Sequence, residues 1–247
     1  TGELASLHKG KGRLAKLTLI MNQIKKIFNY KLFYKNKTLL ITAGPTQEAI
    51  DPVRFISNRS SGKMGYAMAK AAKYYGAEVT LISGPVALDK IAGIEHIDIV
   101  NANEMEEAVT NKMTKKHYDI ICMAAAISDY KPKVLSENKI KSKDKSLSLE
   151  LETTVDILKH TQCSKKTLKI GFALETCNGV VNAKKKMDQK KLDYILLNYA
   201  NEENAGFDSD TNHIYLLSKT GVNKEFILDT KYRIALKIFE YIYHEQY

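Results

Sequence analysis

Cysteine is scarce in this sequence, and its spacing excludes two kinds of structural site. The cysteines are Cys122, Cys163 and Cys177, an odd number without a CxxC pair. Disulfide frameworks use even numbers of cysteines, and thiolate metal sites use closely spaced pairs. We therefore expect neither kind of site, and we expect a reduced, cytoplasmic setting.

Long apolar runs are also missing. No segment approaches the roughly 18 apolar residues of a membrane-spanning helix. The longest apolar stretch near the N-terminus, residues 17–21 (LTLIM), is too short for the core of a secretory signal peptide. The sequence thus predicts a soluble protein that is not exported.

Common metal and cofactor motifs are absent as well. The six histidines are scattered and fit neither an HxxxH nor a Cys/His pattern, so we predict no zinc site and no metal-binding residues. The glycines near residue 62 form neither GxGxxG nor GxxxxGK[ST], which excludes the standard dinucleotide fingerprint and P-loop.

The apolar content of the chain is sufficient for one large domain. Of its 247 residues, 44% are hydrophobic, and a chain of this length can bury a sizeable core. Residues 1–36 begin with a Gly- and Lys-rich stretch and continue as a short basic helix. We predict a linker or leader over residues 1–36 and one domain over residues 37–247.

The formal net charge is +10, which favours anionic partners such as nucleotides, phosphorylated metabolites or nucleic acid. Lysines dispersed over solvated faces would give the same total.

From residue 38 onward, short β-branched runs alternate with helical patterns, which is typical of an α/β domain with a mostly parallel sheet. Asn103 and Glu106 predict a capping-box start for one helix. We expect a Rossmann-like sheet with helices on both faces and residues 118–126 at its centre. The expected strands are residues 38–44, 77–83, 96–100, 118–126, 167–175 and 193–200, and the expected helices are residues 64–75, 103–117, 178–191 and 230–243.

Two further segments predict antiparallel structure. Residues 139–154 alternate with period two and carry many lysines, which favours a β-arm or hairpin over a helix. Residues 213–219 and 224–229 flank turn residues and predict a C-terminal hairpin.

The connection between the first strand and helix, TAGPTQEAIDPVRFISNRSSGKMG, is unusually long, and long ordered loops are often functional. It follows a parallel strand, where Ser60, Ser61, Gly62 and the N–H groups of the next helix could receive an anion. The alternative is a Ser-capped helix with a tight turn at Gly62.

Residues 50–65 resemble the signature of the phosphopantothenate–cysteine ligase family. The matching residues are Gly44, Pro45, Thr46, Glu48, Asp51, Pro52, Val53, Arg54, Ile56, Ser57, Asn58, Ser60, Ser61, Gly62, Lys63, Met64 and Gly65. Three later segments resemble the same family in the same order: AAAISDYKP (124–132), ENKIK (137–141) and GFALET (171–176). Residues 2–15 resemble the join that precedes this domain in bacterial fusions with a flavin-dependent phosphopantothenoylcysteine decarboxylase.

The resemblance implies a ligase that joins (R)-4′-phosphopantothenate to L-cysteine through an acyl-cytidylate, with CTP and Mg²⁺, giving 4′-phosphopantothenoylcysteine, CMP and pyrophosphate. It implies a homodimer in which an arm of one subunit approaches the other's site, with residues 139–154 as the candidate arm. The decarboxylase body is absent from this sequence, so we expect no decarboxylation by this chain alone and regard a decarboxylase as a candidate partner.

The resemblance also assigns roles to residues. Asn58 would donate its amide to the acyl-nucleotide, Arg54 would hold a substrate carboxylate or phosphate, and Lys139 would neutralise the triphosphate. The implied nucleotide contacts are Ser60, Ser61, Gly62, Met123, Ala124, Ala125, Asp129, Lys139, Val155, Asp156, Ile157, Leu158, Phe172, Lys186 and Lys190.

Each of these residues also has an ordinary structural alternative. Arg54 could pair with Asp51 or Glu48, Phe172 could belong to the core, and the lysines could lie on solvated faces. Two other function classes remain open. An NAD(P)-dependent oxidoreductase is disfavoured by the missing GxGxxG, and a nucleic-acid-binding module by the dispersed lysines.

Overall fold

The computed structural model describes residues 2–3, 9–10, 15–27, 32–141, 146–160, 164, 166–206, 208–219, 221 and 223–246. It divides into two units, Thr1–Leu32 and Phe33–Tyr247. The first unit contains the short strands β1 (Gly2–Glu3) and β2 (Lys9–Gly10) and the helix α1 (Leu17–Ile27), which is the basic helix expected there. The second unit starts at Phe33, which packs against Tyr75 and Tyr243.

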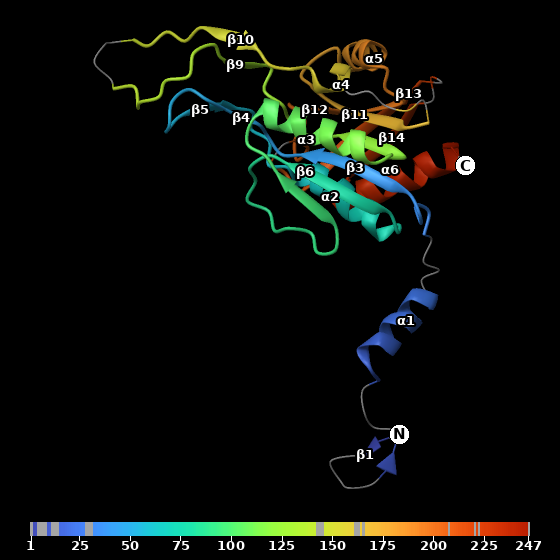
Figure 1. The fold of residues 1–247 in the computed structure, drawn as a ribbon. Helices are drawn as coiled ribbons and strands as arrows, with labels where there is room; N and C mark the ends of the chain where they lie inside the picture. The colour runs from blue at the N-terminus through green and yellow to red at the C-terminus, as the bar shows by residue number, and fades with distance from the viewer. Residues whose placement is uncertain are drawn as a thin grey trace. The chain divides into compact units, whose positions relative to one another are not determined.

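The second unit is built on an eight-stranded sheet (Figure 1) with the order β14-β13-β12-β11-β8-β3-β6-β7. The strands are β3 (Thr38–Ala43), β6 (Glu78–Ser83), β7 (Glu95–Asp98), β8 (Ile120–Met123), β11 (Leu168–Glu175), β12 (Tyr194–Tyr199), β13 (Thr211–Ser218) and β14 (Asn223–Thr230). The strands from β12 to β7 are parallel, and β13 and β14 form the predicted antiparallel hairpin.

The chain reverses its direction of travel across the sheet between β3 and β8. It runs outward from β3 to β7 and then returns to place β8 on the other side of β3. In open α/β sheets such a switch point leaves a crevice at the carboxyl ends of the two strands, and ligands bind there. The topology therefore directs attention to the loops that follow β3 and β8.

Helices cover both faces of the sheet, as predicted. On one face lie α2 (Lys63–Tyr74) and α6 (Lys231–Gln246), and on the other α3 (Ala102–Lys115), the short α4 (Ile157–His160) and α5 (Gly179–Lys190). Leu39 and Ile41 enter the core beneath α2 and α6, whereas Leu40 enters the opposite core. Because alternate residues of a central strand are buried on both sides, its sequence is almost wholly apolar. The Rossmann-like fold class is confirmed.

The start of α3 differs from the prediction. Its N-cap is Asn101, whose side chain accepts a hydrogen bond from the Glu104 N–H at 2.9 Å and donates one to the Glu104 carboxylate at 2.8 Å. The capping box therefore lies two residues before the predicted pair, Asn103 and Glu106. The same N-x-x-E spacing occurs twice, and the buried Glu48 selects the first copy by accepting the Ala102 N–H at 2.9 Å.

The predicted lysine-rich arm exists, but its strands differ from those expected. Strand β9 (Tyr130–Pro132) pairs with β10 (Leu151–Thr153), so the arm begins before residue 139. Residues 142–145 at its far end lie outside the described residues. Beside it lies a hairpin that was not predicted, β4 (Gln47–Ala49) and β5 (Phe55–Ser57), within the long loop after β3 (Figure 1).

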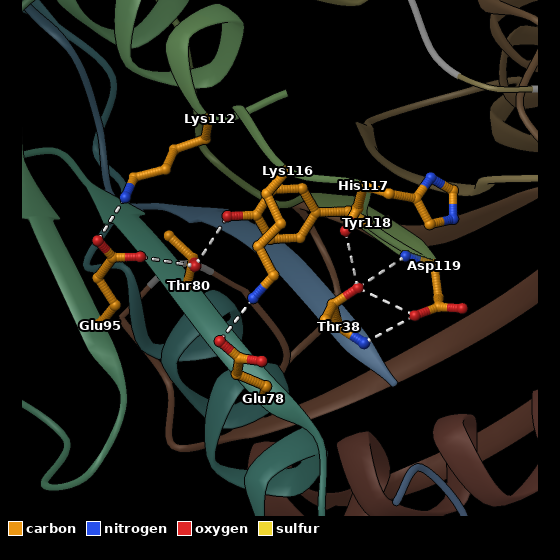
Figure 2. Close-up of polar contacts among 9 residues, drawn as sticks. All are labelled: Thr38, Glu78, Thr80, Glu95, Lys112, Lys116, His117, Tyr118 and Asp119. Carbon is orange, nitrogen blue, oxygen red and sulfur yellow. Dashed lines mark hydrogen bonds and ion pairs between the residues drawn. The ribbon is translucent and has the colours of Figure 1, made fainter. Parts of the chain in front are cut away.

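Polar contacts tie the amino-terminal edge of the parallel strands together (Figure 2). The hydroxyls of Thr80 and Tyr118 lie 3.0 Å apart, and Thr80 also donates to Glu95, which pairs with Lys112 of α3. Asp119 accepts the Thr38 N–H at 2.9 Å. These contacts stabilise the amino-terminal edge of the sheet, opposite the switch-point crevice. Within the described residues, no helix is long and apolar enough to span a membrane.

Candidate functional site

A cavity of about 870 Å³ lies at the carboxyl ends of β3, β8 and β11. Its walls come from segments that are distant in sequence, among them the loop into α2, the segment after β8, the turn into α4, one side of α5 and the first residue of α6. The lining includes residues 60–65, 123–127 and 153–158, Asp129, Phe172, Lys186, Lys190 and Lys231.

The floor of the cavity is formed where the chain leaves β8. The Ala124 N–H donates to the Thr42 carbonyl and the Ala125 N–H to the Thr42 hydroxyl, each at 3.2 Å. The Ala126 N–H donates to the Gly44 carbonyl at 2.9 Å. Because these N–H groups donate to Thr42 of β3 and to Gly44, a nucleobase at Ala124 or Ala125 would have to be recognised through main-chain carbonyls.

Two glycines bring the start of α2 to the cavity wall. Gly62 is the N-cap residue and has φ 74°, a left-handed conformation that glycine adopts without strain. At Gly65, an added Cβ would lie 2.5 Å from the Ala43 Cβ, so only glycine lets α2 approach β3 this closely. Gly62 has no side chain with which to cap, but the Ser60 hydroxyl accepts the Gly62 N–H at 3.3 Å. The alternative is thus observed in part: the tight turn lies at Gly62, and a serine hydroxyl binds the main chain just before the helix. The first N–H groups of a helix lack partners within the helix and attract anions.

Asn58 lines the cavity, but its amide donors are engaged. The side-chain Nδ2 donates to the Ala126 carbonyl at 3.1 Å and to the Ile127 carbonyl at 3.0 Å. These bonds join the loop after β3 to the segment after β8. To donate to a substrate, as predicted, Asn58 would have to exchange one of them.

Two lysines of α5 form a basic wall. The Lys186 ammonium donates to the Phe172 carbonyl at 2.8 Å, and Lys190 pairs with Asp156. Burial, and secondarily the charge of Lys190, lowers the pKa of Lys186 below its ordinary value. Both side chains line the cavity, so the solvated-face alternative is wrong for this pair.

Arg54 and Lys139 lie outside the cavity lining. The Arg54 guanidinium pairs with the buried Asp51 and donates to the Ile140 carbonyl at 2.7 Å, while Asp51 accepts the Ile140 N–H at 3.0 Å. The alternative in which Arg54 pairs with Asp51 is therefore observed. The same contacts place Arg54 beside the exposed Lys139 of the arm. Within a single chain, neither Arg54 nor Lys139 lines the cavity.

Residues 34–245 match the family described as DNA/pantothenate metabolism flavoprotein C-terminal domain. The chain belongs to this family. It is 41% identical over 245 residues to the Coenzyme A biosynthesis bifunctional protein CoaBC of Bacillus subtilis (strain 168). The aligned region covers 98% of this chain and 60% of that protein. The chain thus spans less than two thirds of the length of this relative. The resemblance inferred from residues 50–65 is confirmed.

Solved structures of the family have the same fold. A crystal structure of the C-terminal domain of CoaBC superposes with a TM-score of 0.71 at 38% identity and covers 86% of this chain and 97% of that domain. A mutant of Cab2 in complex with phosphopantothenate-cysteine superposes with a TM-score of 0.71 at 14% identity over 95% of each chain. At that identity the likeness concerns the fold alone.

Most of the predicted nucleotide contacts line this one cavity. They are Ser60, Ser61, Gly62, Met123, Ala124, Ala125, Asp129, Val155, Asp156, Ile157, Leu158, Phe172, Lys186 and Lys190. The described residues contain no group of three or more His, Cys, Asp or Glu arranged to hold a metal.

Three cationic residues of the cavity, Lys63, Lys185 and Lys231, were not assigned to the site from the sequence. Lys63 was noted only as part of the signature, and Lys231 was not identified. Lys231 belongs to no motif, and its only local signal is its place at the start of a helix. Asn198 and Asn212, near the same end of the cavity, were missed for the same reason.

Proposed function

We propose that this chain joins (R)-4′-phosphopantothenate to L-cysteine with consumption of CTP, as a ligase of coenzyme A biosynthesis. The observation that carries the proposal is convergence: apart from Lys139, the residues that the family resemblance assigns to the nucleotide line one cavity at the switch point of the sheet. The similarity to CoaBC over 98% of the chain supports the assignment.

The chemistry requires two transfers. In the first, a carboxylate oxygen of phosphopantothenate attacks the α-phosphorus of CTP, and pyrophosphate leaves with the bonding electrons. In the second, the cysteine amine attacks the acyl carbon, CMP leaves, and the amine proton passes to solvent. Both steps concentrate negative charge on phosphate oxygens, which preorganised N–H groups and cations stabilise. The start of α2 and the basic wall of α5 supply such groups.

Mg²⁺ is the cation expected with a triphosphate. It is held mainly by phosphates and waters and takes one or two carboxylates from the protein. Asp129 lines the cavity and fits that requirement. When bound, Mg²⁺ would neutralise phosphate charge during the transfer.

We further propose that the active form is a homodimer with sites shared between subunits. The arm and its neighbouring hairpin expose large apolar side chains, and such surfaces mark interaction sites. These side chains are Val53, Phe55, Tyr130, Val134, Leu135, Leu147, Leu149 and Leu151. A second copy that covers them would bring Arg54 and Lys139 to the cavity of the partner subunit.

The two other function classes are less well supported. The family match gives no support to an NAD(P)-dependent oxidoreductase. A nucleic-acid-binding module would require a basic surface, whereas the lysines of the site line a concave cavity. Since the CoaBC relative is bifunctional and longer than this chain, a phosphopantothenoylcysteine decarboxylase remains the partner that we propose.

The proposal is tested by pyrophosphate release from purified protein with CTP, Mg²⁺ and phosphopantothenate. We expect release that depends on phosphopantothenate and is lost in Lys139→Ala. In Asn58→Ala we expect acyl-cytidylate to accumulate with little product when cysteine is added. Absence of release from wild type with either CTP or ATP would refute the ligase assignment.

A further inference from the structure

One end of the cavity, at the start of α2, contains two lysines from different helices. Lys63 is the first residue of α2 and Lys231 the first residue of α6, and the two helices pack together on one face of the sheet. Both line the cavity. Two ammonium groups from neighbouring helix starts therefore face the same space.

The two ammonium groups are held by one short segment between β12 and β13. Lys63 donates to the Asp208 carbonyl at 2.8 Å and pairs with the Asp210 carboxylate at 2.7 Å. Lys231 donates to the carbonyls of Gly206, at 2.7 Å, and Ser209. The two lysines are thus fixed relative to each other through a common set of contacts.

The folded protein disfavours the charged form of Lys231. Its side chain is buried, with 5% of the residue exposed. Burial, followed by the charge of Lys63, lowers the pKa of Lys231 to about 8, and the charges of Asp210 and Asp208 only partly oppose this shift. The Asp210 side chain is 87% exposed, so solvent screens its charge. A polyanion in the cavity would relieve the repulsion between the two lysines.

We propose that Lys63 and Lys231 bind the terminal phosphates of the nucleoside triphosphate and hold the pyrophosphate as it leaves, an inference that rests on the proposed function. When the bond between the α-phosphorus and its bridging oxygen breaks, the electron pair stays on that oxygen. The two ammonium groups neutralise the charge that the pyrophosphate gains. They do so by exchanging carbonyl and carboxylate partners for phosphate oxygens.

The position of the pair favours the terminal phosphates over the phosphate of the acid substrate. Lys63 directly follows Gly62, at the helix start where a phosphate chain would be received. The second basic wall, Lys186 and Lys190, comes from α5 beyond β8 and β11, where Lys186 donates to the Phe172 carbonyl at 2.8 Å. A triphosphate that extends from the base past the start of α2 ends at Lys63 and Lys231.

The test compares Lys231→Met and Lys63→Gln with the control Lys237→Met, which removes an exposed lysine of the same helix that pairs with Asp229. Binding of pyrophosphate with Mg²⁺ is measured by calorimetry without other ligands, and CMP binding reports an intact base site. We expect each cavity variant to bind pyrophosphate about tenfold more weakly or worse, the effect of losing one charged hydrogen bond. CMP binding and the control should match wild type.

Steady-state kinetics separate the two phosphate-bearing substrates. We expect the KM for CTP to rise in the cavity variants while the KM for phosphopantothenate stays within about twofold of wild type. Unchanged pyrophosphate affinity, or a rise confined to the KM for phosphopantothenate, would overturn the proposal. If Lys231→Met does not fold, the more exposed Lys63→Gln gives the answer alone.

The calorimetric measurement needs no turnover, so it remains informative if the ligase assignment fails. Lysine-dependent pyrophosphate binding by a protein that does not activate phosphopantothenate would refute the proposed function and leave an anion site in place. Turnover with normal pyrophosphate binding by the variants would refute the site and leave the function intact.

Discussion

At the scale of single residues, the lysines of this protein occupy different environments despite their similar sequence contexts. Lys139 is exposed on the arm, Lys190 is paired with Asp156, and Lys231 is buried against main-chain carbonyls. The net charge of +10 reveals none of this. What each lysine can do depends on how far its charge is removed from water and on what faces it.

The stability of the protein should depend on pH through Lys231. Its pKa is about 8 in the folded state, against an ordinary 10.5. Below pH 8 both states carry the proton, and the folded state bears the cost of the buried charge. Between these values the unfolded state binds more protons, so the free energy of unfolding should rise with pH relative to a variant without this group.

This dependence can be measured by urea denaturation of wild type and Lys231→Met between about pH 7 and 10. The free energy of unfolding of wild type, minus that of the variant, should increase as the pH rises. Parallel curves would show that the Lys231 pKa is not lowered by folding.

At the scale of elements, the two edges of the parallel strands have separate tasks. The amino-terminal edge is closed by side-chain contacts among β6, β7, β8 and α3, with Tyr118 and Thr80 at their centre (Figure 2). The carboxyl edge carries the cavity. Stability and ligand binding should therefore respond to different substitutions.

The substitution Tyr118→Phe tests this separation. Tyr118 is 1% exposed and its hydroxyl meets the Thr80 hydroxyl at 3.0 Å. Loss of this bond should lower the free energy of unfolding by about 1 kcal/mol, measured by urea denaturation, with the KM for CTP and kcat unchanged. A changed KM for CTP would mean that the two edges are coupled.

At the scale of the whole molecule, the predicted catalytic residues fall into two groups. Asn58 lies in the cavity, whereas Arg54 and Lys139 lie together outside it, where the arm meets the β4–β5 hairpin through Asp51 and Ile140. The site shared between subunits that we propose would account for this separation.

Mixing two inactive variants tests the shared site. In a heterodimer of Lys139→Ala and Asn58→Ala, the cavity with an intact Asn58 would receive an intact Lys139 from its partner. Random exchange between symmetric dimers should restore about a quarter of the wild-type sites, measured as formation of 4′-phosphopantothenoylcysteine after the mixed subunits are unfolded and refolded together. Failure to restore activity, while each variant refolded alone stays dimeric, would show that Lys139 acts within its own chain.

Much of the architecture could be predicted from the sequence because it depends on local patterns. Apolar periodicity placed β3, β6, β11 and β12 close to their observed bounds. The signature of residues 50–65 identified the family because it is a dense run of specific residues. These features depend on neighbours within a few positions, which a sequence displays directly.

The tertiary structure alone decided the rest. It selected Asn101 over Asn103 as the cap through Glu48, directed Arg54 to Asp51, and brought Lys231 beside Lys63 at the cavity. Each outcome depends on burial and on contacts between segments far apart in the chain. A charged side chain becomes a binding group or an anchor only when the fold determines how much water surrounds it and which partner it meets.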